Sequence, residues 1–271
     1  MGRVEVPGDL DSVLDEAWKA AESIPGFLGE NEARLLGTIA ACVPRGAIVE
    51  IGSFKGKSTV MLGKVAAHYG LGPMVAIDPH NFGNVELEAH RTSPDASSYS
   101  EFLQNLGVAG VSDLVEVHRA YSTDVAPGWN RPIAFLWIDG DHSYRGAKAD
   151  FDGFAPHLIP GGVVAFHDAL HEFAGPIRVF VEDVLRSDRF GAAGFVQSIA
   201  WAQYRPEDGA RFSSRRAALD RAAAPLIRLL KDERELHGIR KLRFKLRRSR
   251  VPRWALSPKA WAASLNEELC R

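Results

Sequence analysis

Val49-Glu-Ile-Gly-Ser-Phe-Lys-Gly-Lys-Ser-Thr59 is the most informative stretch of this chain of 271 residues. The first of several short apolar runs ends within this stretch, at Ile51. Gly52 and Gly56 let its backbone turn sharply and approach a ligand where a side chain would clash. A strand that leads into such a loop and then into a helix is typical of nucleotide-type ligand sites in α/β proteins. The stretch therefore predicts a ligand-binding loop after the first strand of a sheet.

Two phosphate-binding interpretations of this loop fail. A P-loop places four residues between its first Gly and the Gly-Lys-Ser sequence, whereas three separate Gly52 from Gly56, and the required position holds Ile51. A dinucleotide-binding Gly-x-Gly-x-x-Gly fingerprint would need a second Gly at the position of Phe54. The loop fits neither pattern.

An adenosine-containing ligand without phosphates, such as S-adenosylmethionine, fits the residues better. Such a ligand needs close backbone approach at the loop and an acidic residue after the second strand that accepts hydrogen bonds from the ribose hydroxyls. Asp78 follows the apolar run 74–77, where a doubly wound sheet places its second strand beside the first. In the structural alternative, Gly52 and Gly56 only form a tight turn and Asp78 only caps a loop.

Short apolar runs alternate with helical stretches from residue 47 onward. Continuous apolar strands of this kind are typical of a parallel sheet that helices cover on both faces. We therefore expect an α/β fold with a doubly wound, Rossmann-like sheet, preceded by two amphipathic helices around 10–21 and 35–43. The predicted strands are 47–51, 74–77, 114–117, 133–138 and 162–166, and 195–204 would add a terminal strand or hairpin.

The chain divides into regions of different charge and pattern. With 46% hydrophobic and 25% charged residues, its composition excludes collagen-like, coiled-coil and wholly disordered proteins. Residues 1–204 carry 15 Lys/Arg and 26 Asp/Glu, whereas residues 205–271 carry 18 and 8, so the body is acidic and the tail is basic. We expect an N-terminal helical lid at 1–45, a core domain at 46–204 and a basic helical C-terminal extension at 205–271.

Four motifs together resemble the class I S-adenosylmethionine-dependent methyltransferases, and more narrowly their metal-dependent sugar and antibiotic O-methyltransferases. The resemblance covers about residues 30–204 and leaves the tail outside it. It implies a seven-stranded sheet with one antiparallel edge strand, Glu50 near the methionine amino group of the cofactor and Asp78 on its ribose. The motifs are Glu50-Ile-Gly-Ser-Phe-Lys-Gly-Lys-Ser-Thr59, Ile77-Asp-Pro79, Trp137-Ile-Asp-Gly-Asp-His-Ser-Tyr144 and Pro160-Gly-Gly-Val-Val-Ala-Phe-His-Asp168.

Two clusters of polar side chains, Asp139-Gly-Asp-His142 and His167-Asp168, follow the fourth and fifth predicted strands. Because the carboxyl ends of neighbouring parallel strands meet beside the topological switch point, we expect these side chains to lie together in the ligand crevice. A hydroxyl group is a weak nucleophile at neutral pH, so its methylation needs a base, a Lewis acid or both. Asp139 and Asp168 offer oxygen ligands to Mg²⁺, and the nitrogen of His167 would suit Mn²⁺ or Fe²⁺ equally.

By resemblance, Asp139, His167 and Asp168 bind the metal ion, and His142 is the general base. Relatives often carry a carboxylate at the position of His167, so the identity of the metal ion stays open. An ordinary His pKa of about 6.5 suits His142 to proton transfer near neutrality. In the structural alternative these residues only hydrogen-bond a loop or cap a helix, which we adopt for Asp141 alone. The predicted catalytic residues are His142 and Asp139, and the predicted cofactor contacts are Glu50, Gly52, Ser53, Gly56, Ser58, Asp78 and Asp139.

A metal ion that binds two substrate oxygens indicates an acceptor with adjacent hydroxyls, such as a sugar or a catechol. The polar loop 80–100 and the region 18–31 would close over a hydrophilic acceptor. We expect metal-assisted O-methylation of a sugar hydroxyl in a glycoside or polysaccharide precursor, and the resemblance suggests a methylated mannose oligosaccharide. The alternatives are a catechol-type O-methyltransferase and an antibiotic-type hydroxylase or methoxylation component.

The basic tail has three candidate partners. Its apolar stripe of Ile239, Leu242 and Leu246 would be buried by docking onto the acidic body and left exposed for a membrane surface. Phe244 is the one aromatic residue in this basic run, so nucleic acid is the least favoured partner. We expect docking within the chain or onto a second subunit of a homo-oligomer, ahead of membrane contact. Two cysteines, with neither a signal-peptide pattern nor a long apolar stretch, predict a cytoplasmic protein.

Overall fold

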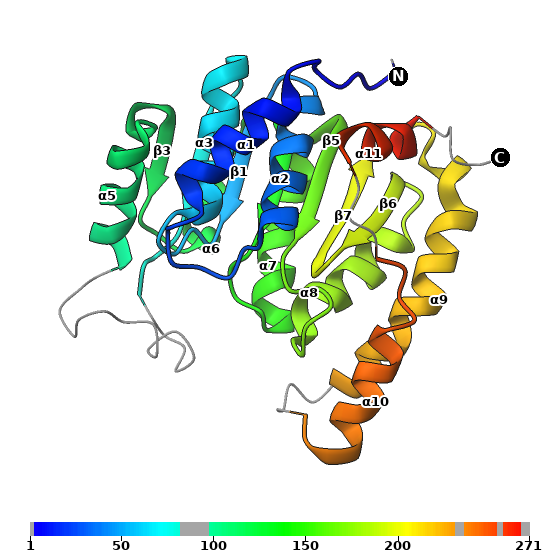
Figure 1. The fold of residues 1–271 in the computed structure, drawn as a ribbon. Coiled ribbons are helices and arrows are strands. Elements are labelled where there is room, and N and C mark those ends of the chain that lie inside the picture. Colours follow the sequence, from blue (N-terminus) through cyan, green and yellow to red (C-terminus); the bar gives the residue numbers. More distant parts are fainter. Residues whose placement is uncertain (1–2, 82–97, 231–235, 254–256, 267–271) are drawn as a thin grey trace.

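A computed structural model describes residues 3–81, 98–230, 236–253 and 257–266. Its centre is a seven-stranded sheet in the order β3-β2-β1-β4-β5-β7-β6, with helices on both faces (Figure 1). This architecture confirms the predicted doubly wound, Rossmann-like α/β fold. The strands are β1 (Ala47–Ile51), β2 (Met74–Ile77), β3 (Val115–His118), β4 (Ile133–Ile138), β5 (Leu158–Phe166), β6 (Phe190–Val196) and β7 (Ile199–Tyr204).

Strands β1 to β5 are parallel, and their order places the topological switch point between β1 and β4. Every residue of these two strands is buried, which is why their sequences are almost continuous apolar runs. Neighbours along a strand point to opposite faces of the sheet. Trp137 of β4 therefore packs in the core on one face, and Leu136 packs in the core on the other.

Strands β6 and β7 form the hairpin that the last apolar segment predicts, although β6 begins earlier, at Phe190. β7 runs antiparallel to both β5 and β6. The antiparallel strand therefore lies one position inside the sheet rather than at its edge, because the turn folds β7 back between β5 and β6. Gln197 supplies the left-handed φ of 51° in this turn.

Two helical layers cover the sheet (Figure 1). The first layer packs over the face that holds Trp137, and α11 (Pro258–Leu265) joins it; the second covers the face that holds Leu136. A single turn, α6 (Ser122–Val125), follows β3. The first layer contains α1 (Leu10–Ala21), α2 (Glu30–Cys42), α3 (Lys57–Tyr69) and α5 (Ser98–Ala109), and the second contains α7 (Tyr144–Phe154), α8 (Ala174–Val179) and α9 (Ser213–Leu230).

The two N-terminal helices share the core of the sheet. Leu14 of α1 and Leu36 of α2 are fully buried. A Cβ at Gly37 would lie only 2.4 Å from the Leu14 side chain, so the helices cross in direct contact. This packing fixes α2 relative to the sheet, and its first turn reaches the end at which β1, β4 and β5 terminate.

The basic tail continues from α9 into α10 (Gly238–Arg248), at the lower end of the molecule in Figure 1. α10 packs onto α9 through Phe244, which is 1% exposed. The expected docking therefore occurs, but it does not bury the predicted stripe: Ile239, Leu242 and Leu246 are exposed because Phe244 lies on the opposite side of the helix. Among the described helices, none is both long and apolar enough to cross a membrane.

Candidate active site

The ends of β1 and β4 meet at Gly52 and Asp139. The Asp139 N–H donates to the Ile51 carbonyl oxygen (2.8 Å), and the Gly52 N–H donates to the Ile77 carbonyl oxygen (2.9 Å). Gly52 has a φ of 87°, and a Cβ there would lie 2.2 Å from the Asp139 carbonyl oxygen. A glycine is required here because the two loops pack directly together, whatever ligand the loop binds.

Asp78 ties the end of β2 to the glycine loop. Its Oδ2 accepts hydrogen bonds from the N–H groups of Ser53 (2.7 Å) and Phe54 (2.8 Å), and its Oδ1 accepts one from the His80 N–H (2.6 Å). The Ser53 side chain is buried, and its hydroxyl has no hydrogen-bond partner in the described chain. Phe54 and His80 hold left-handed φ angles of 47° and 53°, a conformation that clusters at functional sites.

Glu50 is enclosed beneath this loop. Its fully buried carboxylate accepts hydrogen bonds from the hydroxyls of Ser58 and Thr59, in the first turn of α3. Burial raises the pKa of Glu50 to about 7, against the opposing effect of these two donors. Gly56 precedes α3 with a φ of 90°, and a Cβ there would lie 3.1 Å from the Phe102 ring. Ser58 therefore acts on Glu50, a partner that the sequence pattern does not reveal.

Asp139, His142 and Asp168 form the centre of the site. They follow β4 and β5, and each offers a ligand atom within 4.8 Å of those of the other two. His142 Nε2 lies 3.5 Å from Asp139 Oδ1 and 3.7 Å from Asp168 Oδ2, and among the described residues it has no hydrogen-bond partner. Burial alone would lower the pKa of His142, but the two carboxylates raise it above its ordinary value.

His167 lies behind this cluster and is 3% exposed. Its Nδ1 lies 3.1 Å from Asp139 Oδ1 and 3.5 Å from Asp168 Oδ1, and its Nε2 faces Glu32 Oε2 at 3.7 Å. Against the effect of burial, these carboxylates raise the pKa of His167 well above its ordinary value. Both ring nitrogens thus face carboxylates, an arrangement that favours the charged form of His167.

Most residues of this site lie in a segment that matches a known protein family. Residues 49–169 match the model of a family described as methyltransferase domains. This part of the chain is a methyltransferase domain. The matched segment holds every residue that the sequence analysis places in the cofactor, metal and catalytic sites.

Solved structures share the fold of this methyltransferase domain. The O-methyltransferase NovP matches with a TM-score of 0.56 and 14% identity, over 72% of this chain and 98% of its own. Cofactor-bound Rv0187 from MTB matches with a TM-score of 0.52 and 19% identity, over 74% of this chain and 91% of its own. TomG is a Streptomyces achromogenes O-methyltransferase involved in tomaymycin synthesis, and its structure was solved with S-adenosylmethionine. It matches with a TM-score of 0.50 and 20% identity, over 74% of this chain and 92% of its own. At these identities the likeness shows the class I methyltransferase fold.

The donors in the methyltransferase domain fit a divalent cation. Two carboxylates and Nε2 of His142, which makes no hydrogen bond among the described residues, offer ligand atoms within 4.8 Å of one another. Carboxylate oxygens suit Mg²⁺, and a nitrogen donor suits Mn²⁺ as well. His142 is the third residue of this group. His167, the ligand predicted from the sequence, places its Nδ1 3.1 Å from Asp139 Oδ1 and 3.5 Å from Asp168 Oδ1, and its role as a metal ligand stays a prediction.

Glu32 of α2 is the site residue that the sequence analysis missed. Its Oε1 accepts hydrogen bonds from the Ser198 N–H (3.0 Å) and hydroxyl (2.5 Å), and its Oε2 accepts one from the Gly29 N–H (3.2 Å) while facing His167. In the sequence, Glu32 is an acidic residue three positions after a helix start, which is a common capping arrangement. Nothing in that pattern indicates contact with the end of β5.

Other side chains surround the cluster. His171 Nδ1 lies 2.9 Å from Asp168 Oδ1, and the Phe173 ring packs against that of His142 with centroids 4.5 Å apart. Of the two regions expected to cover the site, residues 82–97 of the polar loop lie outside the described residues. In the other region, the Trp18 ring lies 5.1 Å from Lys57 Nζ, so α1 reaches the start of α3 beside the glycine loop.

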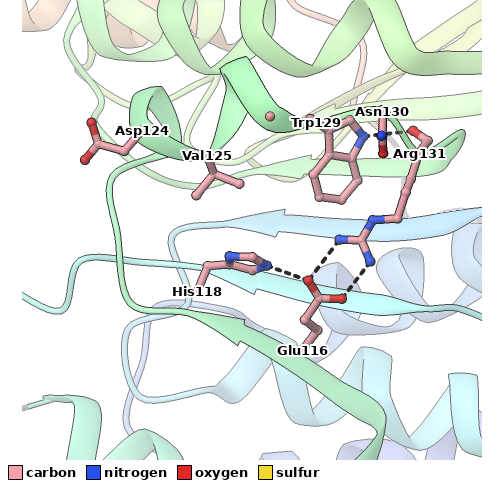
Figure 2. Close-up of a pocket in the computed structure, with 8 residues that line it drawn as sticks. Glu116, His118, Asp124, Val125, Trp129, Asn130 and Arg131 are labelled. Atoms are coloured by element: carbon pink, nitrogen blue, oxygen red, sulfur yellow. Dashed lines mark hydrogen bonds and ion pairs between the residues drawn. The ribbon is translucent and has the colours of Figure 1, made fainter.

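A separate cavity of about 370 Å³ lies at the β3 edge of the sheet and holds none of the predicted site residues. Figure 2 shows Glu116 and His118 of β3 facing Trp129 and Arg131, which precede β4. The Arg131 guanidinium donates to both carboxylate oxygens of Glu116 (2.6 and 3.0 Å), and His118 Nε2 lies 2.6 Å from Glu116 Oε1. Arg131 and His118 both pair with Glu116, and we assign no step of methyl transfer to this cavity.

Proposed function

We propose that this chain is an S-adenosylmethionine-dependent O-methyltransferase that methylates a hydroxyl group of a small acceptor. The observation that carries the proposal is the buried Nε2 of His142, which makes no hydrogen bond among the described residues and lies between two carboxylates at the ends of β4 and β5 of a methyltransferase domain. A hydroxyl nucleophile needs a proton acceptor in this position. NovP and TomG, which share the fold, are O-methyltransferases, and this likeness supports the same class of reaction.

The cofactor would lie across the ends of β1, β2 and β4. The unpaired Ser53 hydroxyl and the Asp78 carboxylate lie together there, and Asp78 retains lone pairs for the ribose hydroxyls. Glu50 would balance the positive charge of the methionine part from beneath the loop, with Ser58 holding its carboxylate. Gly52 and Gly56 shape the loop, and Asp139 closes the site on the β4 side.

In the reaction, the acceptor oxygen attacks the methyl carbon, a new C–O bond forms, and the C–S bond of the sulfonium breaks. The hydroxyl proton passes to His142 Nε2. Asp139 and Asp168 stabilise the resulting imidazolium because their carboxylates lie within 4 Å of that nitrogen. Glu32 and His167 hold Asp139 in place from behind.

Asp139 and Asp168 would also hold a divalent cation, Mg²⁺ or Mn²⁺, which when bound would orient the acceptor hydroxyl and lower its pKa. His142 Nε2 lies within reach of the same point. The roles of metal ligand and proton acceptor therefore compete for one nitrogen atom, and metal dependence distinguishes them.

We propose a sugar hydroxyl as the acceptor, as the resemblance to sugar O-methyltransferases suggests. The carboxylates and imidazoles of the site support a hydrophilic acceptor with adjacent hydroxyls. A catechol has the same pair of oxygens, so it is the second candidate. A methylated mannose oligosaccharide stays a prediction.

The test is transfer of a labelled methyl group from S-adenosylmethionine to mannosides, rhamnosides and catechols, with Mg²⁺, with Mn²⁺ and with excess EDTA. Labelled glycoside that disappears with EDTA and in Asp168→Asn would support a metal held by the two carboxylates. Asp141→Asn is the matched control, because Asp141 caps the loop at Ser143 instead of facing the cluster. Turnover that is indifferent to EDTA would leave His142 as a metal-independent base. Labelled catechol without labelled glycoside would contradict the sugar assignment.

A further inference from the structure

Helix α10 is fixed to the rest of the chain by one of its sides. Phe244 is buried in the core of the second helical layer. On the same side, Arg240 donates a hydrogen bond to the Leu229 carbonyl oxygen of α9 (2.7 Å), and Lys241 pairs with Glu172 (3.4 Å). These contacts determine which side of the helix faces the body and which faces solvent.

The solvent side carries the apolar stripe. Ile239, Leu242 and Leu246 are spaced so that they fall on one face of a helix, and they are 70%, 58% and 56% exposed. Three large aliphatic side chains in a row, all solvated, are costly in water and mark a binding surface. No described part of the chain covers them.

Basic side chains lie on both borders of this stripe. With 3.6 residues per turn, Arg243 and Arg247 flank it on one side and Lys245 flanks it on the other. All three are exposed. Residues 236–253 contain eight Lys/Arg and no Asp or Glu, so the segment that carries the stripe is itself strongly positive.

We propose that α10 binds an anionic lipid surface. Ile239, Leu242 and Leu246 would enter the acyl boundary, while the flanking arginines and lysine would contact lipid phosphates, as interfacial amphipathic helices do. The apolar stripe and the positive borders both contribute to this partner. Nucleic acid would use only the charges, and a second α10 would bring two positive surfaces together.

The position of the helix suits this partner. Glu172, which pairs with Lys241, lies in the segment between Asp168 and α8. Helix α10 therefore lies at the same end of the molecule as the ends of β4 and β5 (Figure 1). A chain bound through α10 would hold its candidate active site near the lipid surface. This inference does not depend on the proposed methyl transfer.

The test is co-sedimentation of the full chain with vesicles of phosphatidylcholine alone and with vesicles of equal parts phosphatidylcholine and phosphatidylglycerol. We expect binding to the anionic vesicles that weakens with salt. Two variants, Ile239→Ser/Leu242→Ser/Leu246→Ser and Arg243→Gln/Arg247→Gln, should each lower partitioning by at least about tenfold. Val108→Ser, which removes an 85% exposed apolar side chain from α5, is the matched control and should bind like the unaltered chain.

Because every substituted side chain is exposed, thermal unfolding should show unchanged folding in all variants. Three results would overturn the proposal. The unaltered chain could fail to sediment with anionic vesicles. The triple serine variant could bind them as well as the unaltered chain, which would leave a charge-only surface of the kind that nucleic acid uses. Light scattering without lipid could instead show a dimer that the triple variant lacks, which would assign the stripe to a second copy.

Discussion

Glu32 Oε2 and His167 Nε2 face each other at 3.7 Å, across the junction of α2 with the end of β5. The other nitrogen of His167 lies 3.1 Å from Asp139 Oδ1, so an imidazole joins two carboxylates from distant parts of the chain. The N-terminal helices thus contribute to the site directly. Their packing against the sheet sets where Asp139 points.

Glu32→Gln should therefore slow methyl transfer although Glu32 is remote from the reacting atoms. We expect kcat to fall by about 10- to 100-fold, as for other partners that orient a ligand or base from behind. Binding of S-adenosylmethionine, measured by calorimetry, should change little. Glu30→Gln, at the exposed start of the same helix, is the control. Equal kcat values for the two variants would remove Glu32 from the account.

His142→Gln should have the largest effect on the chemical step. Loss of the proton acceptor is expected to lower kcat by about 10²- to 10⁴-fold. Cofactor affinity should be kept, because the predicted cofactor contacts do not include His142. Single-turnover kinetics would measure the step, with His157→Gln, outside the cluster, as the control. A variant that retains its kcat would show that another group takes the proton.

Gly52→Ala should disrupt the junction of β1 and β4. A Cβ would lie 2.2 Å from the Asp139 carbonyl oxygen, and the φ of 87° is strained for alanine. Left-handed strain and overpacking together predict a loss of about 2–5 kcal/mol in the free energy of unfolding. Denaturant unfolding would measure it. Gly128→Ala, where a Cβ would meet nothing within 4 Å, should be close to neutral.

Glu50 should make folding stability depend on pH. Its pKa is about 7 in the folded chain against an ordinary value of 4.5, so the folded state holds a proton that the unfolded state releases. Stability from this group is fully present below about pH 4.5 and is lost as the pH rises to about 7. Between about pH 4.5 and pH 7, the free energy of unfolding of Glu50→Gln should therefore rise by on the order of 3 kcal/mol relative to that of the unaltered chain.

The comparison is made without cofactor, by denaturant unfolding at a series of pH values. Only the change with pH is read, because glutamine also alters the hydrogen bonds from Ser58 and Thr59 at every pH. For the surface variant Glu207→Gln, the difference in the free energy of unfolding from the unaltered chain should not change with pH. A flat difference for Glu50→Gln would show that the pKa of Glu50 is the same in the folded and unfolded chain.

The sequence predicts β1, β2 and β4 well because these strands are buried on both faces. The runs that become β1, β2 and β4 end at the predicted residues, since Gly52, Asp78 and Asp139 stop the apolar pattern. The same logic predicts that Asp139 and Asp168 meet, because strand ends meet at one edge of a parallel sheet.

The contacts between side chains in the site are harder to predict from the sequence. Whether His142 or His167 completes a metal group depends on where α2 places Glu32, which is a tertiary contact without a local pattern. The stripe on α10 shows the same difficulty. Its periodicity is plain in the sequence, but both Phe244 and the stripe are apolar, and only the packing against α9 shows which side is buried.

The central claim is methyl transfer from S-adenosylmethionine to a hydroxyl group. Mass spectrometry of the product formed with cofactor that carries an isotopically labelled methyl group tests it most directly. Methyl transfer predicts an acceptor heavier by one labelled methyl group, with an equal amount of S-adenosylhomocysteine. An acceptor heavier by one oxygen atom and free of label would contradict methyl transfer and indicate hydroxylation.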